Sequence, residues 1–207
     1  MTRLVSMLAG IALLASAQAF AEQNLVGDAE AGKAKSATCA ACHGADGISS
    51  SPQWPHLAGQ VPGYIATQLE YFQQGAEGPR ENAIMAGMVA ALSPQDIADL
   101  DAYFVSLPAH KGSITPEQEE LALAGQQIYK AGEEEFSVPA CMGCHLPNGA
   151  GIAPAYPRLA GLPKEYVQAQ LLAYKSGARQ NPMMNPIAYP LSEAQIEALA
   201  TYISGLN

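Results

Sequence analysis

The chain has 207 residues, enough for one large or two small domains, and 49% of them are apolar. Only 14% are charged, and 19 acidic against 10 basic side chains give a formal net charge of −9. This balance argues against nucleic-acid binding, which needs clustered basic side chains. It leaves two interpretations of the acidity: solubility alone, or selection of a basic docking partner.

The N-terminus has the parts of a secretory signal peptide. Arg3 supplies a positive charge, residues 4–17 are apolar or small, and an A-x-A cleavage site precedes Glu22. We predict a signal peptide over residues 1–21, cleaved near Ala21/Glu22, and export to the periplasm. The apolar run is shorter than a membrane span requires. The mature protein is therefore expected to be soluble, or at most peripherally bound to a membrane.

The rest of the first half predicts helices. Pro62 is expected to open a helix over residues 62–74 that stops before a glycine. Ser93, with Asp96 three residues later, predicts a capping box for an amphipathic helix that ends near Leu107. The residues that follow this helix are expected to form a short linker with little to pack.

The second half predicts the same elements in the same order. Thr115 is expected to start its first helix, and a second helix is predicted over residues 163–176 after a proline. Ser192 predicts the cap of a last helix that ends near Leu206. No run in either half shows the apolar–polar alternation of a strand, so the expected fold class is all-α.

The two halves are copies of each other. Cys39 and Cys141 lie 102 residues apart, and "WPHLAG" at 54–59 matches "YPRLAG" at 156–161 with the same offset. Toward the end of each copy the matching residues lie 99 positions apart, and before the cysteines they lie 93 positions apart. The second copy therefore has extra residues around 132–140, before its cysteines. We predict three segments of the mature chain: a first domain over 22–108, a linker over 109–115 and a second domain over 116–207.

Each copy carries one C-x-x-C-H motif, and together the two motifs contain all four cysteines, which leaves none for structural disulfides. On a helical turn, positions i, i+3 and i+4 share a face, so two thiols can bind the vinyl groups of a porphyrin while the histidine reaches its iron. A zinc site needs four close ligands, and a thioredoxin-like dithiol needs a strand–helix context. The motif therefore predicts two covalent haem c groups, bound through these residues: Cys39, Cys42 and His43, and Cys141, Cys144 and His145.

Methionine is the expected second axial ligand of each iron. Met85 and Met184 each lie eight residues before the serine that caps the last helix of their domain, so the duplication preserves their position. Met88 and Met183 are the rivals, and core filling is the alternative role for all such methionines. His56 and His110 have no histidine counterpart in the other half and are expected in loops at the surface.

A proline follows each motif histidine at the same distance. Pro55 and Pro157 lie twelve residues after His43 and His145. A ligating histidine usually donates its second ring N–H to a carbonyl, which orients the ring and raises its basicity. Because proline restricts the loop that presents its carbonyl, we predict that these two carbonyls accept from the two histidines.

With these residues in place, each half resembles a class I cytochrome c. The chain from about Asp28 to Asn207 resembles the dihaem cytochrome c4 family of bacterial periplasmic electron carriers. The resemblance rests on the two C-x-x-C-H motifs, the "LAGQ" loop at 57–60 and Met-x-Gly-Met before Leu-Ser at 85–93. The second copy departs from the last pattern, with Asn-Pro after Met184, so the choice between Met183 and Met184 stays open there.

The resemblance implies two tandem class I cytochrome c domains related by a pseudo-twofold axis, with haem propionates facing each other across the interface. It also places axial methionines at Met85 and Met184. The expected function is that of a monomeric periplasmic electron carrier, not an enzyme, which links respiratory-chain components and delivers electrons to a terminal oxidase. Two alternatives remain open: a cytochrome subunit of a larger oxidoreductase, and a dihaem enzyme such as a peroxidase.

Overall fold

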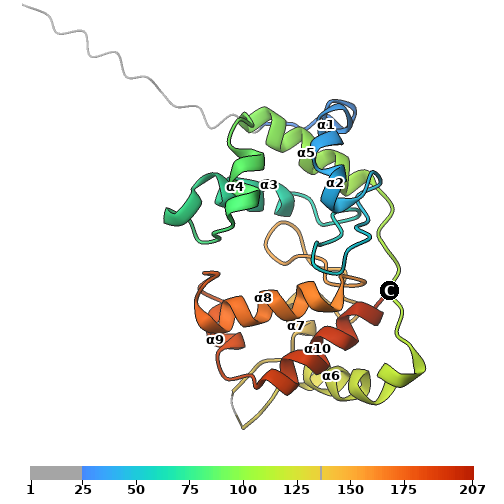
Figure 1. Ribbon diagram of the computed structural model, residues 1–207. Coiled ribbons are helices and arrows are strands. Elements are labelled where there is room, and N and C mark those ends of the chain that lie inside the picture. The colour runs from blue at the N-terminus through green and yellow to red at the C-terminus, as the bar shows by residue number, and fades with distance from the viewer. Residues whose placement is uncertain (1–24, 136) are drawn as a thin grey trace, which may run out of the picture.

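A computed structural model of the protein describes residues 25–135 and 137–207, so the predicted signal peptide lies outside the described residues. Within these ranges the regular structure is entirely helical, as the sequence predicts, and strand-like pairing is limited to isolated bridges. Figure 1 shows two helical domains, one formed by each half of the chain. None of the helices in these ranges has the length and apolar composition needed to cross a membrane.

The two domains repeat one order of helices. The first domain contains α1 (Ala29–Lys35), η1 (Ser36–Thr38), α2 (Ala40–His43), α3 (Tyr64–Gln73), η2 (Gly75–Glu77), α4 (Ala83–Val89) and α5 (Pro94–Ser106). The second contains η3 (Pro116–Gln118), α6 (Glu119–Ala131), α7 (Met142–His145), α8 (Lys164–Ser176), α9 (Met184–Ala188) and α10 (Glu193–Gly205). Helices α2 and α7 are the single turns that carry the C-x-x-C-H motifs.

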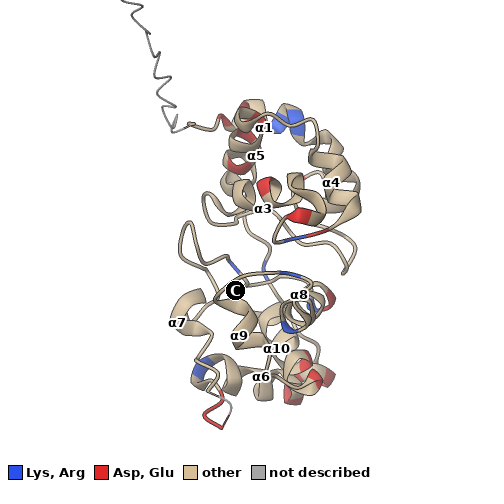
Figure 2. Ribbon diagram, turned by 90° about the vertical axis from the view of Figure 1, so that its left-hand side faces the viewer, with Lys and Arg blue, Asp and Glu red and all other residues tan. Residues whose placement is uncertain are grey.

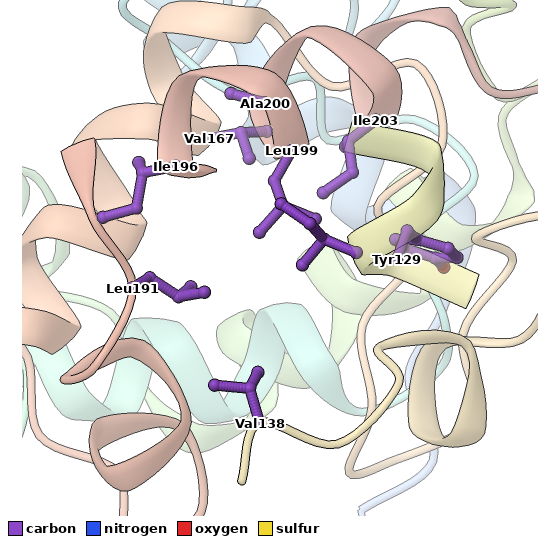
Figure 3. Close-up of a cluster of buried hydrophobic side chains, with 9 residues drawn as sticks. Tyr129, Val138, Val167, Leu191, Ile196, Leu199, Ala200 and Ile203 are labelled. Carbon is purple, nitrogen blue, oxygen red and sulfur yellow. The ribbon is translucent and has the colours of Figure 1, made fainter. Parts of the chain in front are cut away.

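The first and last helices cross in each domain, α1 on α5 and α6 on α10. A glycine lies at each crossing, because a Cβ atom at Gly32 or Gly125 would come within 2.0 Å of a carbonyl oxygen of the facing helix. Behind the second crossing lies a cluster of buried apolar side chains from α6, α8 and α10 and the connecting loops, which includes Tyr129, Ile196 and Leu199 (Figure 3).

The predicted helix ends agree with the structure at the caps and differ at the prolines. Ser93 and Ser192 each form a complete capping box with the residue three positions later. Helix α3, however, begins two residues after Pro62, because Gly63 adopts the left-handed conformation (φ +84°) that helices exclude. Pro163 is likewise the cap of α8 and not its first residue.

The linker is packed, which corrects the expectation that it has little to pack. The His110 ring lies 4.4 Å from the His56 ring, centroid to centroid, and Ala109 lies so close to Gly59 that a Cβ there would meet it at 2.4 Å. Toward the second domain, the Ile114 side chain packs against Gly205, where an added Cβ atom would lie 2.7 Å from its Cγ2. The linker therefore contacts both domains.

The interface between the domains is reciprocal. The Arg80 guanidinium donates to the Tyr166 hydroxyl (2.8 Å), and the Arg179 guanidinium donates to the Tyr64 hydroxyl (3.0 Å). Each arginine also donates to glutamines of both domains, Gln68 and Gln170. Since each contact has a counterpart with the domains exchanged, the domains are related by a pseudo-twofold axis.

Candidate metal centres

The two C-x-x-C-H motifs fold into equivalent single turns. In each motif the first cysteine precedes the turn, the second lies within it, and the histidine ends it. Cys39, Cys42, Cys141 and Cys144 are all free thiols. His43 and His145 are each 7% exposed. Each turn therefore presents two unbonded thiols and one buried imidazole, the donor set that covalent attachment of a haem requires.

A proline carbonyl holds each imidazole. The distance from Nδ1 of His43 to the Pro55 carbonyl oxygen is 2.9 Å, and the distance from Nδ1 of His145 to the Pro157 carbonyl oxygen is also 2.9 Å. Because a carbonyl can only accept, Nδ1 carries the proton in both rings and Nε2 keeps its lone pair. Burial lowers the pKa of both histidines, which favours the neutral imidazole that binds metals.

Two glycines that sequence reasoning passed over position these carbonyls. The Gly47 carbonyl accepts from the backbone N–H groups of Leu57 and Ala58, and the Gly149 carbonyl accepts from those of Leu159 and Ala160. Both glycines have a positive φ, +74° and +69°, a conformation that L-residues rarely adopt. The available signal was their spacing, because they lie 102 residues apart, as the cysteines do.

The candidate methionines lie on two short equivalent helices, Met85 on α4 and Met184 on α9. Both are half-buried, whereas the rivals Met88 and Met183 are 47% and 45% exposed. Within the described part of the chain, neither half-buried methionine packs against its domain's buried cluster, although Met142 does. Met142 therefore packs in the core of the second domain, whereas Met85 and Met184 lie outside these two clusters.

An asparagine side chain accepts from the backbone N–H of each candidate methionine, another feature that sequence reasoning missed. The Asn82 side chain accepts from the Met85 N–H at 2.9 Å, and the Asn181 side chain accepts from the Met184 N–H at the same distance. The two asparagines are 99 residues apart, the same offset as the methionines. Asn82 is the N-cap of α4, whereas Asn181 lies two residues before Met183, the N-cap of α9. In both helices the hydrogen bond holds the backbone that carries the methionine.

His56 and His110 are loop residues, as predicted, but they are not free surface groups. Both are half-buried, and their rings pack against each other. The His56 ring also accepts from the Ser49 N–H at 3.0 Å. Burial, with His110 nearby, lowers the pKa of His56 to about 4. The ring is therefore neutral at physiological pH.

Comparison with known proteins identifies relatives for both domains. The family model for cytochrome c matches residues 29–108 and 122–207. Cytochrome c4 from Azotobacter vinelandii is 43% identical over 192 residues, which are 87% of this chain and 90% of that protein. The crystal structure of reduced recombinant cytochrome c4 from Pseudomonas stutzeri superposes with a TM-score of 0.83 at 40% identity, covering 88% of this chain and 100% of that one.

A relative with a different description is also similar over most of the chain. The thiosulfate dehydrogenase electron acceptor of Thiomonas intermedia is 35% identical over 175 residues. This match covers 82% of the present chain and 79% of that protein. A protein that accepts electrons from thiosulfate dehydrogenase is thus similar to most of this chain.

Proposed function

The chain belongs to the cytochrome c4 family, and from this premise we propose that it is a periplasmic carrier that passes electrons from a respiratory-chain donor to a terminal oxidase. Its two cytochrome c domains bind two haem c groups, and it is an electron-transfer protein with redox proteins as partners. The observation that supports the proposal most directly is the repeated histidine–proline pair beside two free thiols.

The residues present fit a haem in each domain. Cys39 and Cys42, and Cys141 and Cys144, are proposed to form the thioether bonds, with the adjacent histidine as the first axial ligand of each iron. The interface supplies a second point of fit, because the Arg179 side chain is 6% exposed. In the described ranges no carboxylate lies within ion-pair distance of Arg80 or Arg179. Haem propionates would give the buried Arg179 and the half-buried Arg80 an anionic partner.

We assign the second axial positions to Met85 and Met184. Three features support this choice: the shared offset, the shared hydrogen bond to an asparagine side chain and the lower exposure compared with Met88 and Met183. With histidine and methionine as ligands, each iron would have no open coordination position for a substrate or for oxygen. Methionine ligation also raises the reduction potential relative to ligation by two histidines, which suits delivery of electrons to an oxidase.

The iron of each haem supplies a one-electron couple, and the chain determines how that couple is used. The proline carbonyls orient the imidazoles and raise their basicity. The reciprocal interface holds the two domains in one arrangement, so an electron that enters through one domain can leave through the other. Figure 2 shows acidic residues on α5 and α6, and basic residues on α1 and α6 as well as near the domain boundary. The net charge of −9 would favour partners with basic docking surfaces.

Absorption spectra of four single variants test the ligand assignment. The ferric protein should show low-spin, methionine-ligated haem at both sites. Met85→Ala and Met184→Ala should each remove the methionine signature from one haem. The matched controls are Met88→Ala and Met183→Ala, which remove the neighbouring methionines and should leave both signatures. Loss of a signature in Met183→Ala, with retention in Met184→Ala, would overturn the assignment for the second domain.

The proposed electron acceptor and location need separate measurements. Reduced holoprotein mixed with purified terminal oxidase should be oxidised at a rate that falls as ionic strength rises, because docking of charged surfaces is screened by salt. Cell fractionation should recover the mature chain, starting near Glu22, in the periplasm. Failure of every oxidase of the source cell to oxidise it would overturn the proposed acceptor.

The second candidate is a cytochrome that serves a specific oxidoreductase. It is favoured by the likeness to the thiosulfate dehydrogenase electron acceptor of Thiomonas intermedia. Co-purification with a catalytic subunit in fixed stoichiometry would support this candidate over a free carrier. Sustained peroxide turnover by the purified protein would instead point to a dihaem enzyme and would contradict both electron-transfer candidates.

A further inference from the structure

One glutamine crosses from the first domain to the backbone of the second. Gln60 is 8% exposed, and its side-chain oxygen accepts from the Arg158 N–H at 2.6 Å. Its side-chain nitrogen donates to the Arg158 carbonyl at 3.1 Å. The same oxygen also accepts from the Val61 N–H at 2.9 Å. Three hydrogen bonds thus hold this buried amide in one orientation, across the domain boundary.

The peptide group that Gln60 contacts is the one that holds the second motif histidine. The Arg158 N–H and the Pro157 C=O belong to the same peptide bond, and the Pro157 oxygen lies 2.9 Å from Nδ1 of His145. A hydrogen bond to the N–H of an amide polarises its carbonyl and strengthens the bond that the carbonyl accepts, by about 10–30% per bond. Gln60 therefore strengthens the hydrogen bond that the Pro157 carbonyl accepts from His145 Nδ1–H.

The first domain has no equivalent. The corresponding peptide joins Pro55 to His56, and among the described residues the His56 N–H has no hydrogen-bond partner. The residue at the position of Gln60 in the second copy is Leu162, which packs against the core of its own domain. The two histidine–carbonyl pairs have equal distances but different surroundings.

We propose that Gln60 is a positioning residue that makes the two haems inequivalent by lowering the potential of the second one. This inference rests on the proposed function, because it takes His145 as an axial ligand. A stronger hydrogen bond from Nδ1–H makes the imidazole a better electron-pair donor to the iron through Nε2. A better donor stabilises the ferric state more than the ferrous state, and second-shell hydrogen bonding is an established means of tuning haem potentials.

The variant Gln60→Leu tests the proposal, because it gives the first domain the residue that the second already has. The midpoint potential of the second haem should rise, while that of the first should not change. We expect about a threefold change in the ratio of oxidised to reduced second haem at a fixed potential. At 59 mV per tenfold for a one-electron couple, this corresponds to about 30 mV. The two haems are followed separately through their haem methyl signals in NMR spectra during a redox titration.

A matched control separates this effect from a loosened interface. Tyr166→Phe removes the interdomain hydrogen bond from Arg80 and leaves the Pro157–Arg158 peptide untouched. It should not reproduce a rise confined to the second haem. Equal shifts of both haems in Gln60→Leu, no shift at all, or the same selective rise in Tyr166→Phe would each overturn the proposal.

A measurement on the unaltered holoprotein does not depend on any variant folding. In the reduced, diamagnetic protein the Nδ1–H proton of His145 should resonate farther downfield than that of His43, because its hydrogen bond is stronger. Equal positions or the reverse order would contradict the inference. Ring signals of His145 that show no hyperfine shift in the oxidised protein would instead refute its ligand role, and with it the proposed function at this site.

Discussion

Helix α6 approaches α10 so closely at Gly125 that a methyl group has no room there. A Cβ atom at Gly125 would lie 2.0 Å from the Ala198 carbonyl oxygen and 2.9 Å from the Leu199 nitrogen. Ordinary contacts begin at 3.4 Å, so the variant Gly125→Ala must move the helices apart by about 1.4 Å. The obstructing atoms are backbone, which cannot rotate away as the end of a side chain can.

The expected cost follows from two opposing effects. Overpacking costs about 1–3 kcal/mol, and a clash with backbone belongs at the upper end of that range. Replacing glycine by alanine inside a helix returns about 0.5–1 kcal/mol. We therefore expect Gly125→Ala to lower the free energy of unfolding by about 2 kcal/mol. For a chain of this size that is a fall in Tm of roughly 4–8 °C.

Thermal unfolding of the holoprotein, followed by far-UV circular dichroism, measures this effect. Gly32→Ala should behave alike, because its Cβ would lie 2.0 Å from the Asp99 carbonyl oxygen. The matched control is Gly143→Ala, which has no neighbouring atom within 4 Å and has Ala41 as its counterpart in the first motif. A Tm of Gly125→Ala at or above that of the unaltered protein would refute the packing argument.

Three further outcomes are expected. Asn181→Ala removes the side-chain oxygen that accepts from the Met183 and Met184 N–H groups. It should lower the free energy of unfolding by about 1 kcal/mol and weaken the methionine signature of the second haem, and an unchanged spectrum and Tm would contradict the positioning role. Arg179→Gln removes a buried charge with three hydrogen-bond partners. It should lower the free energy of unfolding, measured in urea, by about 2 kcal/mol. An unchanged unfolding midpoint would count against the interface network. His56→Asn should flatten the pH dependence of stability below neutrality: because the folded pKa of His56 is about 4, the unfolded chain takes up the proton first, and stability falls as pH drops from about 6.5 to 4. Parallel pH profiles of the variant and the unaltered protein would show that His56 contributes nothing.

Features that depend on neighbours along the chain were predictable. The capping boxes at Ser93 and Ser192 each join residues three positions apart, and both form as expected. The start of α3 was predicted two residues early, because proline is a good first helical residue but Gly63 takes a left-handed conformation that the sequence does not reveal. The assignments of the axial methionines stay predictions, supported by burial and by the hydrogen bonds to Asn82 and Asn181.

The sequence alone determined that this chain is a duplicated C-x-x-C-H protein, because the motif and its repeat are matters of spacing. Only the tertiary structure decided how the two copies contact each other. The Gln60–Arg158 and Arg179–Tyr64 contacts join residues 98 and 115 positions apart, and no local propensity specifies such pairs. They exist because two similar domains pack about a pseudo-twofold axis. The substitution of Leu162 for Gln60 in the second copy then makes that packing unequal.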